Sequence, residues 1–594
     1  MRAEAKPLVF LKEVDKLIVP SYQRNYVWTE VNWKELLKGF LDKDRNYDFL
    51  GSIILKETTS GGLKQFEIID GQQRLTTLSI LLKAILDSLP EELKGTYKIE
   101  INNLLTCFPD LEKLDSCKSH HNYRLELGPG DAEVFWEILS GSVDVKKIDK
   151  NSPKILRCYK YYIDKLKEYN TNEKEQLLKR LLNPNNRIFV VIILDKEQNE
   201  LKIFDTLNTT GIRLTLSDIV KNLLYKQVIY LKKRDGYSEE DSKNYAIKLY
   251  EETWLEKFEK DQITHKYWER KVPYDRKERN NLEFLLYSIA IIKDILKADN
   301  NIINLPIYYR KYIEEIRSLE DLEKFINDIL EYADIYGEKI DIINDDILIS
   351  YDDYKKRLLY ILKELKISSF HSFILYVFKK YKNDEDKIKE LLTKLEKYII
   401  KKQIISARSA DYSNYSKNFI KNISNLDKEI NKINWEQIQN GLRNIREQVA
   451  KVVLFIIELY RRKKDERCSE KALAPKYWLE LIMPKEWEKH WNFDKVPQSV
   501  RIESTEEKPE EYRNKRIRYL GNMILLLPEV KETRKRGSVS FTEKIKSIKK
   551  WGTFYTTRDD IVIPYENGDT IWDEAKIEAR TEKLERELKE ILGE

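Results

Sequence analysis

The amino-acid sequence predicts an α/β domain at residues 1–215, an all-α spacer at 216–473 and a smaller α+β domain at 474–594. In the first range, short apolar runs rich in β-branched residues alternate with helix-length segments. In the second, apolar residues recur at three and four spacing, and no proline occurs between Pro306 and Pro475. The last range returns to short apolar runs before a terminal helix.

The elements follow from these patterns in chain order. The first domain has apolar runs of strand length, which are Gly51 to Leu55, Phe66 to Ile69 and Phe189 to Asp195. Strands that are apolar on both faces predict a small covered sheet, with polar loops at one edge. The run from Leu75 to Leu89 predicts a helix closed by Pro90. In the spacer, Leu282 to Leu296 and Ile445 to Tyr460 predict packed helices.

Composition narrows the function classes. The 594 residues include 107 Lys and Arg against 101 Asp and Glu, a net charge of +6, so a nucleic-acid surface would have to be a local patch. The four cysteines show no CxxC spacing, which argues against a zinc knuckle and a disulfide framework. No apolar run reaches the length of a membrane span. We therefore expect a cytoplasmic protein without a membrane partner.

The segment Asp70-Gly71-Gln72-Gln73-Arg74 lies between an expected strand and an expected helix. The N-terminus of a helix carries partial positive charge and free N–H groups. Arg74 can hold a phosphate or a carboxylate bidentately, Gly71 lets the backbone approach a ligand, and Gln72 and Gln73 supply amide donors and acceptors. The segment predicts a binding site; the alternative is a tight turn with Arg74 paired to a surface carboxylate.

Two earlier segments strengthen the prediction of a site. Val19 to Trp28 contains Tyr22, Gln23 and Arg24 between aromatic residues, and Phe49 to Ile54 follows it. Together with the Asp70 segment, these blocks resemble the N-terminal domain of GmrSD-type modification-dependent restriction systems. The segments Phe204 to Gly211 and Leu214 to Asn222 are similar to the next block of that family.

The resemblance implies a ParB/sulfiredoxin-like α/β domain that binds and hydrolyses a nucleoside triphosphate (NTP) with a divalent metal such as Mg²⁺. It implies catalytic roles for Gln23, Arg24, Asp70, Gln72, Gln73 and Arg74. It implies nucleotide contacts for Tyr22, Gly71, Thr76, Asn208 and Gly211. The chain has no GxxxxGK[ST] segment, so this NTPase would not be of the P-loop kind.

The C-terminal range resembles the HNH-like nuclease domain, of the ββα-metal type, that is fused to the same module in this family. An HNH centre needs an imidazole as general base, a metal ion and an Asn that orients the imidazole. Leu481 stands where the family has that His, whereas Asn522 remains in its Leu-Gly-Asn setting. Where a later Asn is expected before Phe541, the chain has a basic run that includes Arg534, Lys535 and Arg536.

Two explanations of this departure compete. In the first, the nuclease centre has decayed and the domain only binds DNA, since residues 511–550 contain twelve Lys or Arg and four Glu. In the second, His490, Glu480 or Glu486 acts as base or metal ligand in a rebuilt centre. Leucine cannot accept a proton, and general-base geometry tolerates little displacement, which favours the first explanation.

The expected function is thus an anti-phage restriction-like protein in which NTP hydrolysis by the first domain controls DNA binding or cleavage by the last. Its expected partners are an NTP and DNA, including modified phage DNA. A homo-oligomer or a second protein of the defence system is compatible with this expectation. The alternatives are a DNA-binding or adaptor protein without catalysis, and a metal-dependent endonuclease with a rebuilt site.

Overall fold

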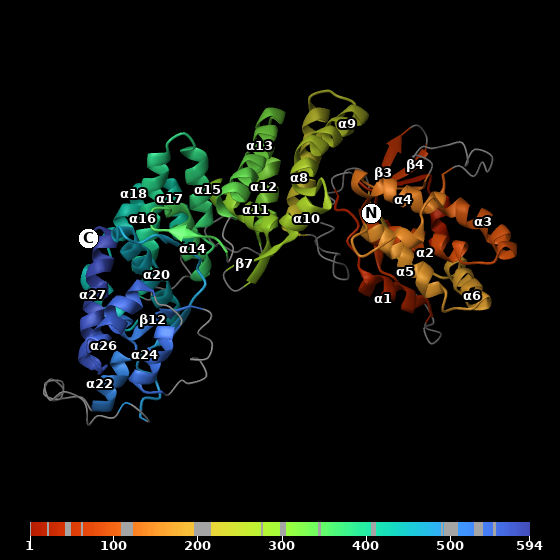
Figure 1. Ribbon diagram of the computed structural model, residues 1–594. Helices are drawn as coiled ribbons and strands as arrows, with labels where there is room; N and C mark the ends of the chain where they lie inside the picture. Colours follow the sequence, from red (N-terminus) through yellow and green to blue (C-terminus); the bar gives the residue numbers. More distant parts are fainter. Residues whose placement is uncertain are drawn as a thin grey trace. The chain divides into compact units, whose positions relative to one another are not determined.

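The computed structural model describes residues 2–20, 23–41, 49–60, 63–107, 123–194, 215–274, 277–296, 304–341, 346–405, 412–488, 491, 509–527, 539–550 and 554–594. The chain forms two compact units. Unit 1 comprises Met1–Glu256 and Arg317–Leu319, and unit 2 comprises Lys257–Ile316 and Glu320–Glu594. Figure 1 shows their helices and strands.

Unit 1 contains a mixed six-stranded sheet with the order β1-β6-β3-β4-β2-β5. Its strands are β1 (Arg2–Lys6), β2 (Lys16–Ile18), β3 (Ser52–Ser60), β4 (Leu63–Asp70), β5 (Leu125–Glu126) and β6 (Phe189–Leu194). β3 is parallel to β6 and antiparallel to β4, while β2 runs parallel to both β4 and β5. The β3–β4 register places Ile54 opposite Asp70, so the polar segment begins beside β3.

Helices bury one face of this sheet in a large core (Figure 1). The helical segments up to β6 are η1 (Leu8–Glu13), α1 (Glu30–Leu41), α2 (Gln72–Asp87), α3 (Glu91–Leu105), α4 (Pro129–Ser140), η3 (Val145–Lys147), α5 (Lys154–Leu166) and α6 (Thr171–Leu182). α2 is buried along nearly its whole length and packs against α3, α4 and α5. Ile54, Ile69 and Ile192 form a smaller apolar cluster from alternate strand positions, as expected for strands that are apolar on both faces.

After the sheet, the chain becomes helical at α8 (Leu216–Arg234), followed by α9 (Glu239–Tyr250) and the π-helical η4 (Glu251–Glu259). α8 begins at Leu216 because Thr215 and Asp218 form a capping box: the Thr215 hydroxyl accepts from the Asp218 backbone N–H, and the Asp218 carboxylate accepts from the Thr215 N–H.

The first part of unit 2 consists of packed helices with two short strand pairs among the described residues. The helical segments are α10 (Gln262–Glu269), α11 (Asn281–Ile292), α12 (Leu305–Glu315), α13 (Leu319–Ile335), η6 (Tyr336–Ile340), α14 (Tyr354–Glu364), α15 (His371–Lys380), α16 (Glu385–Ile404), α17 (Tyr412–Lys421), α18 (Ser424–Asn431), α19 (Trp435–Leu442) and α20 (Glu447–Lys464). β7 (Lys271–Tyr274) pairs with β8 (Lys277–Asn280), and β9 (Ile349–Ser350) pairs with β10 (Ala472–Leu473).

The C-terminal part of unit 2 is α+β. β11 (Trp478–Leu481) and β12 (Met523–Leu526) form an antiparallel pair. The helical segments are α22 (Pro509–Arg516), η9 (Leu520–Asn522), α24 (Phe541–Lys550), α25 (Tyr555–Thr557), η11 (Arg558–Val562), α26 (Ile563–Glu566) and α27 (Glu574–Leu592). A separate apolar core joins these elements and includes Trp487, Ile524 and Trp572.

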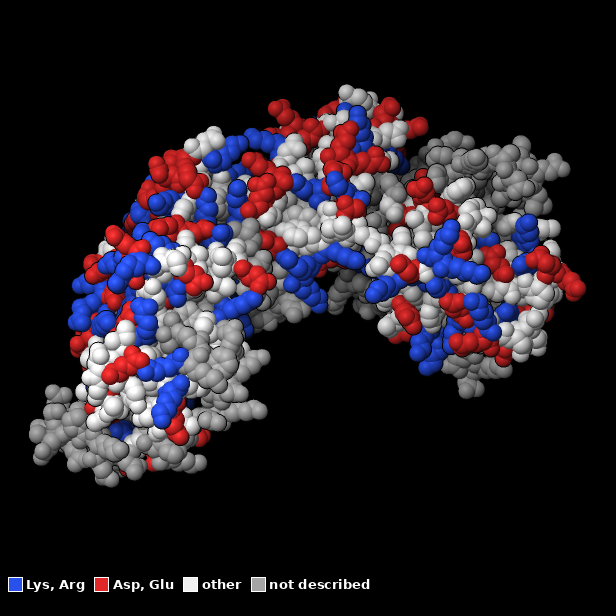
Figure 2. All heavy atoms as spheres, in the orientation of Figure 1, with Lys and Arg blue, Asp and Glu red and all other residues white. Residues whose placement is uncertain are grey.

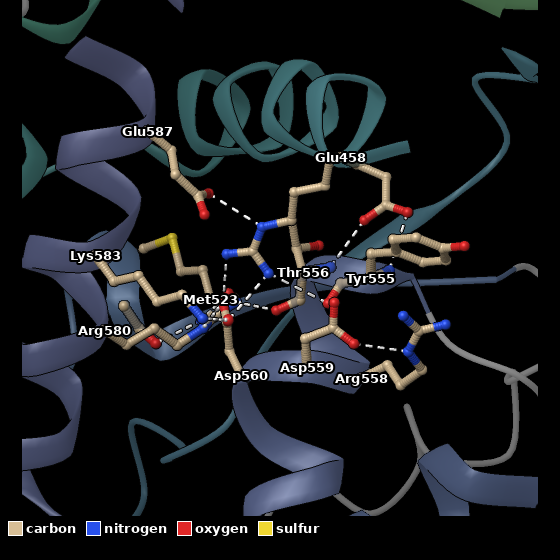
Figure 3. A network of polar contacts seen from close by, with 12 residues as sticks. Glu458, Met523, Tyr555, Thr556, Arg558, Asp559, Asp560, Arg580, Lys583 and Glu587 are labelled. Atoms are coloured by element: carbon tan, nitrogen blue, oxygen red, sulfur yellow. Dashed lines mark hydrogen bonds and ion pairs between the residues drawn. The ribbon is translucent and has the colours of Figure 1, made fainter. Parts of the chain in front are cut away.

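A buried ion network holds α20 to the C-terminal elements (Figure 3). Arg461 of α20 donates two hydrogen bonds of 2.9 Å to the Asp560 carboxylate of η11, and its Nε lies 3.0 Å from Glu587 of α27. Arg580 of α27 lies 3.3 Å from Asp560. Although burial alone would raise it, the pKa of Asp560 is lowered by these guanidinium groups.

The coarse fold prediction is confirmed: the chain is mixed α/β, mostly helical, with a small mixed sheet. The predicted strands lie in β3, β4 and β6, and the predicted helix after the polar segment is α2, which begins three residues earlier than expected. The ParB/sulfiredoxin-like and HNH-like assignments and the three domain ranges stay predictions. Among the described helices, none is long and apolar enough to cross a membrane.

Basic and acidic side chains are interspersed over the face shown in Figure 2. This mixture agrees with the near balance of 107 basic and 101 acidic residues in the whole chain. The basic run at Arg534, Lys535 and Arg536, which was predicted to contact DNA, lies outside the described residues.

Candidate functional site

The turn between β4 and α2 depends on Gly71. Its φ of 102° lies in the left-handed region, which favours glycine. A Cβ at this position would lie 3.0 Å from Cγ1 and 3.3 Å from Cα of Ile53. Glycine is therefore required by the backbone conformation and also by the close approach of the turn to β3. As a result, Gln72 and Gln73 occupy the first turn of α2 directly beside the sheet.

The two glutamines fasten the segment around Arg24 to the start of α2. Gln72 Nε2 donates to the backbone oxygen of Arg24 at 3.0 Å. Gln73 Nε2 donates to the backbone oxygen of Asn25 at 3.2 Å, and Gln73 Oε1 accepts from the Val27 N–H at 2.8 Å.

Gln23, in the segment that contains Arg24, adds a bond from its own side chain: its Nε2 donates to the backbone oxygen of Ile68 in β4 at 2.7 Å. The two Gln-Arg segments that the sequence singled out are thus brought together in one place.

The first turn of α4 also holds this loop. Gly128 is the N-cap of α4, and Pro129 is in its first turn. Asp131 Oδ2 accepts from the Tyr26 N–H at 2.5 Å. The side chain of Asn25 lies where a Cβ of Gly130 would be, since that Cβ would approach Asn25 Nδ2 to 2.7 Å. The loop is therefore bonded to the N-terminal turns of two helices.

Tyr26 anchors the loop in the core of unit 1. Its hydroxyl lies 2.5 Å from Thr77 Oγ1 and accepts from Trp33 Nε1 at 2.9 Å. The hydroxyl also contacts Cys158 Sγ at 3.5 Å. Burial raises the pKa of Tyr26 well above its usual value, so the phenol stays neutral. The loop is thus bonded to the core at Tyr26, two residues after Arg24.

A shallow pocket lies between this loop and the first turns of α2 and α4, and its space amounts to about 260 Å³ when the open solvent at its mouth is included. Arg24, Gln72, Thr76 and Asp131 are among its lining residues. Gln72 is only 9% exposed, yet its Oε1 has no hydrogen-bond partner within the described parts of the chain. A buried acceptor without a partner costs about 1–3 kcal/mol, and a hydroxyl, an amine or a cation of a ligand would satisfy it. We call this the α2–α4 pocket.

Arg74 does not line the α2–α4 pocket. Its Nη1 donates to the backbone oxygen of Ser52, and Nη2 lies 3.7 Å from Asp70 Oδ2. Gly51, with a φ of 106°, leaves room for the guanidinium, because a Cβ there would lie 3.4 Å from Arg74 Cζ. The whole residue is 8% exposed. The structure thus gives the Arg74 side chain contacts within the sheet and the turn, and the Arg74–Asp70 pair is half-buried at the end of β4.

Several predicted site residues cannot be placed against these contacts. Tyr22, Asn208 and Gly211 of the nucleotide site and His490 of the nuclease-like site lie outside the described residues, as do the basic residues at 534–536. Their roles stay predictions.

Asn522 in unit 2 has a filled hydrogen-bonding shell. Its Oδ1 accepts from the Met483 N–H at 2.8 Å and from Trp572 Nε1 at 3.3 Å. Its Nδ2 donates to the backbone oxygens of Met483 at 2.9 Å and Ile517 at 3.1 Å. An Asn side chain makes at most these four bonds, and Asn522 is fully buried. From η9, the side chain thus bonds to the segment after β11, to the residue after α22 and to Trp572 before α27, and no bond remains for orienting an imidazole.

Leu481 and Glu480 lie at the end of β11 against α24. Lys544 of α24 donates to the backbone oxygen of Leu481, and its Nζ lies 3.2 Å from Glu480 Oε1. Burial lowers the pKa of Lys544. Within the described residues, no group of three or more His, Cys, Asp and Glu side chains could hold a metal ion.

Sequence reasoning missed the contribution of α4. Asn25, Gly128 and Asp131 line the α2–α4 pocket, but none of them was a predicted site residue. The stretch Gly128-Pro129-Gly130-Asp131 does carry a helix-start signal, with Pro and an acidic residue in the first turn. That signal locates a helix N-terminus but does not tell which loop packs on it.

Comparison with known proteins gives a family match and a similar curated protein. Residues 8–225 match the family model described as the GmrSD restriction endonuclease, N-terminal domain. The chain is also 23% identical over 327 residues to the uncharacterized protein MJ0686 of Methanocaldococcus jannaschii, which covers 49% of this chain and 50% of that protein. The chain thus matches about half the length of that relative. The family match covers β2 to β6 and the α2–α4 pocket, and it supports a GmrSD-type restriction protein.

Proposed function

We propose that this chain is a restriction or anti-phage defence protein in which unit 1 binds and hydrolyses an NTP and thereby controls contact of unit 2 with DNA. The observation that carries the proposal is the α2–α4 pocket. There, two distant Gln-Arg segments and two helix N-termini surround a buried amide oxygen that has no partner among the described residues.

The chemistry of the pocket suits a phosphorylated ligand. The N-termini of α2 and α4 contribute partial positive charge and N–H groups, which favour anions. Arg24 lines the pocket and supplies a guanidinium for phosphate oxygens. Gln72 Oε1 can accept from a ribose hydroxyl or orient a water molecule for attack. These residues would bind the ligand and position water, while Gln73 and Tyr26 hold them in place.

The pocket also fits the Mg²⁺ that accompanies an NTP. Mg²⁺ prefers oxygen ligands and usually keeps several waters, so one or two protein oxygens suffice. The amide oxygen of Gln72 and the carboxylate of Asp131 line the pocket and would serve. When bound, the ion would neutralise phosphate charge.

For unit 2, we propose DNA binding without cleavage. Leu481 cannot act as a general base, and the four bonds of Asn522 are filled. These two observations favour the decayed centre over a rebuilt one. They also support the alternative of a DNA-binding or adaptor protein, in which the α2–α4 pocket binds a partner or phosphates without catalysis.

The test incubates the full chain with each NTP and Mg²⁺, with and without plain and modified DNA, and follows phosphate release and DNA integrity in the same tubes. Arg24→Ala should abolish nucleotide binding and phosphate release. Lys98→Ala, an exposed change on α3 that removes the same charge, should alter neither. If the wild type binds DNA in a salt-sensitive way but ignores every nucleotide, the adaptor alternative replaces the proposal. Metal-dependent DNA cleavage would instead support the rebuilt nuclease.

A further inference from the structure

A second pocket lies in unit 2, between the β11–β12 pair and α24. It contains about 420 Å³ of space that is open to solvent. Its apolar lining residues are Ile524, Leu526, Val539 and Ile548, and its polar lining residues are Glu480, Glu543, Lys544 and Ser547. We call it the β11–α24 pocket. No residue of the α2–α4 pocket contributes to it.

The polar part of this pocket contains a hydrogen-bond donor beside a hydrogen-bond acceptor. Lys544 is 6% exposed, and its ammonium contacts the Glu480 carboxylate and the Leu481 backbone oxygen. An ammonium has three N–H donors, and within the described part of the chain these two contacts leave one of them for a ligand. The Glu480 carboxylate has two oxygens and accepts from Lys544 through Oε1. The pair thus presents a hydrogen-bond donor and an acceptor side by side on an apolar wall.

An aromatic ring lies on the same sheet face. In the β11–β12 register, Glu480 is opposite Ile524 and Trp478 is opposite Leu526. Alternate strand residues share a face, so Trp478 is on the face that carries Glu480 and the two apolar lining residues. Trp478 is 41% exposed, so part of its ring is accessible to solvent.

From this juxtaposition we propose that the β11–α24 pocket takes one unpaired nucleobase, which stacks on Trp478 and directs its hydrogen-bonding edge to Glu480 and Lys544. The inference rests on the proposed contact of unit 2 with DNA and names the group that is read. Nucleobases carry donors next to acceptors on one edge, and an apolar face on each side of the ring.

A phosphate suits the pocket less well than a base. The lining contains two carboxylates, Glu480 and Glu543, and one ammonium, so its net charge is negative. Glu543 already accepts from the Ser540 N–H and hydroxyl at the start of α24. An anion would meet repulsion there, whereas a neutral heterocycle buries apolar surface and fills the donor and acceptor of the Glu480–Lys544 pair.

The experiment uses the full chain in EDTA and two fluorescein-labelled duplexes that differ at one position. One duplex has a single unpaired cytosine, and the other has an abasic site in its place. Anisotropy gives the affinity ratio of the two probes. The wild type should prefer the unpaired cytosine by roughly tenfold, as expected for one stacked base. Lys544→Met and Trp478→Ala should each bring the ratio close to one.

Lys549→Met is the matched control, because Lys549 is an exposed cation on the same helix and does not line the pocket. Lys549→Met should weaken the binding of both duplexes equally and leave their affinity ratio unchanged. Since Trp478 is 41% exposed and lies outside the buried core, Trp478→Ala decides the question even if Lys544→Met does not fold. Equal affinity of the wild type for both probes, or a ratio that survives Trp478→Ala, overturns the base pocket while DNA binding stands. Absence of binding to either probe overturns the DNA contact proposed for unit 2 and the base pocket with it.

Discussion

Two buried amides, one in each unit, come from segments that the sequence singled out as functional, and they differ in one respect. Asn522 in unit 2 makes all four hydrogen bonds that its side chain allows, whereas Gln72 in unit 1 donates to Arg24 and leaves Oε1 without a partner among the described residues. A filled amide stabilises a fold, and an unfilled one is suited to a ligand. The same residue chemistry thus serves structure in one unit and is open to function in the other.

The largest expected effect is that of Asn522→Ala. The change leaves the Met483 backbone N–H, the Trp572 ring N–H and two backbone oxygens without their partner at a fully buried position. The free energy of unfolding should therefore fall by about 3–5 kcal/mol. Urea unfolding of the full chain measures it. Asn567→Ala, at an exposed position, should change stability by less than about 0.5 kcal/mol. A loss for Asn522→Ala no larger than that of the control would break the comparison.

Gly71→Ala should come next, with Gly236→Ala as its partner. Both glycines have positive φ, 102° and 94°, but a Cβ at Gly71 meets Ile53, while one at Gly236 meets no atom of a described residue within 4 Å. Gly236→Ala should cost roughly 1 kcal/mol for the backbone alone. Gly71→Ala should cost roughly 2–3 kcal/mol and also weaken nucleotide binding, as thermal unfolding with and without NTP would show. Equal costs would mean that the close approach to β3 carries no energy.

Gln72→Met and Gln73→Met sharpen the contrast within one helix turn. Gln73 bonds to Asn25 and Val27, so its loss should cost about 2 kcal/mol of stability, against about 1 kcal/mol for Gln72. Nucleotide affinity should show the opposite order, because only Gln72 has an unfilled acceptor in the pocket. Denaturant unfolding and nucleotide titration of the same two proteins test both statements. If affinity follows stability in both variants, Gln72 has no separate role toward the ligand.

The smallest effect concerns pH and belongs to unit 2. Burial beside Phe284 lowers the pKa of His371 from 6.5 to about 4. Between these pH values the unfolded chain binds more protons at this site than the folded one, so stability falls as the pH is lowered from 6.5 towards 4. His371→Gln should remove roughly 1–2 kcal/mol of this loss, seen as a flatter dependence of Tm on pH between 7 and 5. An unchanged slope would assign acid sensitivity to other groups.

The sequence allowed the elements around the site to be predicted more fully than its contacts. β3, β4, β6 and α2 follow from apolar runs of characteristic length, and the turn at Gly71 follows from the glycine between them. The contacts of Arg74 were not predictable in this way, because a guanidinium that reaches a backbone oxygen of β3 looks the same in sequence as one that binds phosphate. The local sequence pattern indicates whether a segment is a helix or a strand. The hydrogen-bond partners of its side chains depend on which distant segments pack against it.

The same holds for the two amides. The Gln73–Val27 bond joins residues 46 positions apart, and the Asn522–Met483 bonds join residues 39 apart. Nothing in the sequence around Asn522 tells that its four bonds are filled, since each partner is a backbone group or a ring nitrogen of a residue elsewhere. The family resemblance singled out the segments that contain both amides, and their functional roles stay predictions. The structure distinguishes the filled amide from the unfilled one.

The ion network of Figure 3 bears on how this chain could be recombined with others in evolution. Asp560 is 2% exposed as a side chain, and Arg461 of α20 supplies two of the hydrogen bonds that keep it ionised. A gene segment that encoded the C-terminal elements without α20 would produce a buried carboxylate deprived of a main partner, at a cost of several kcal/mol. The smallest C-terminal portion that could be inherited as a folded unit therefore includes α20. It begins at or before Glu447, well before β11 and β12.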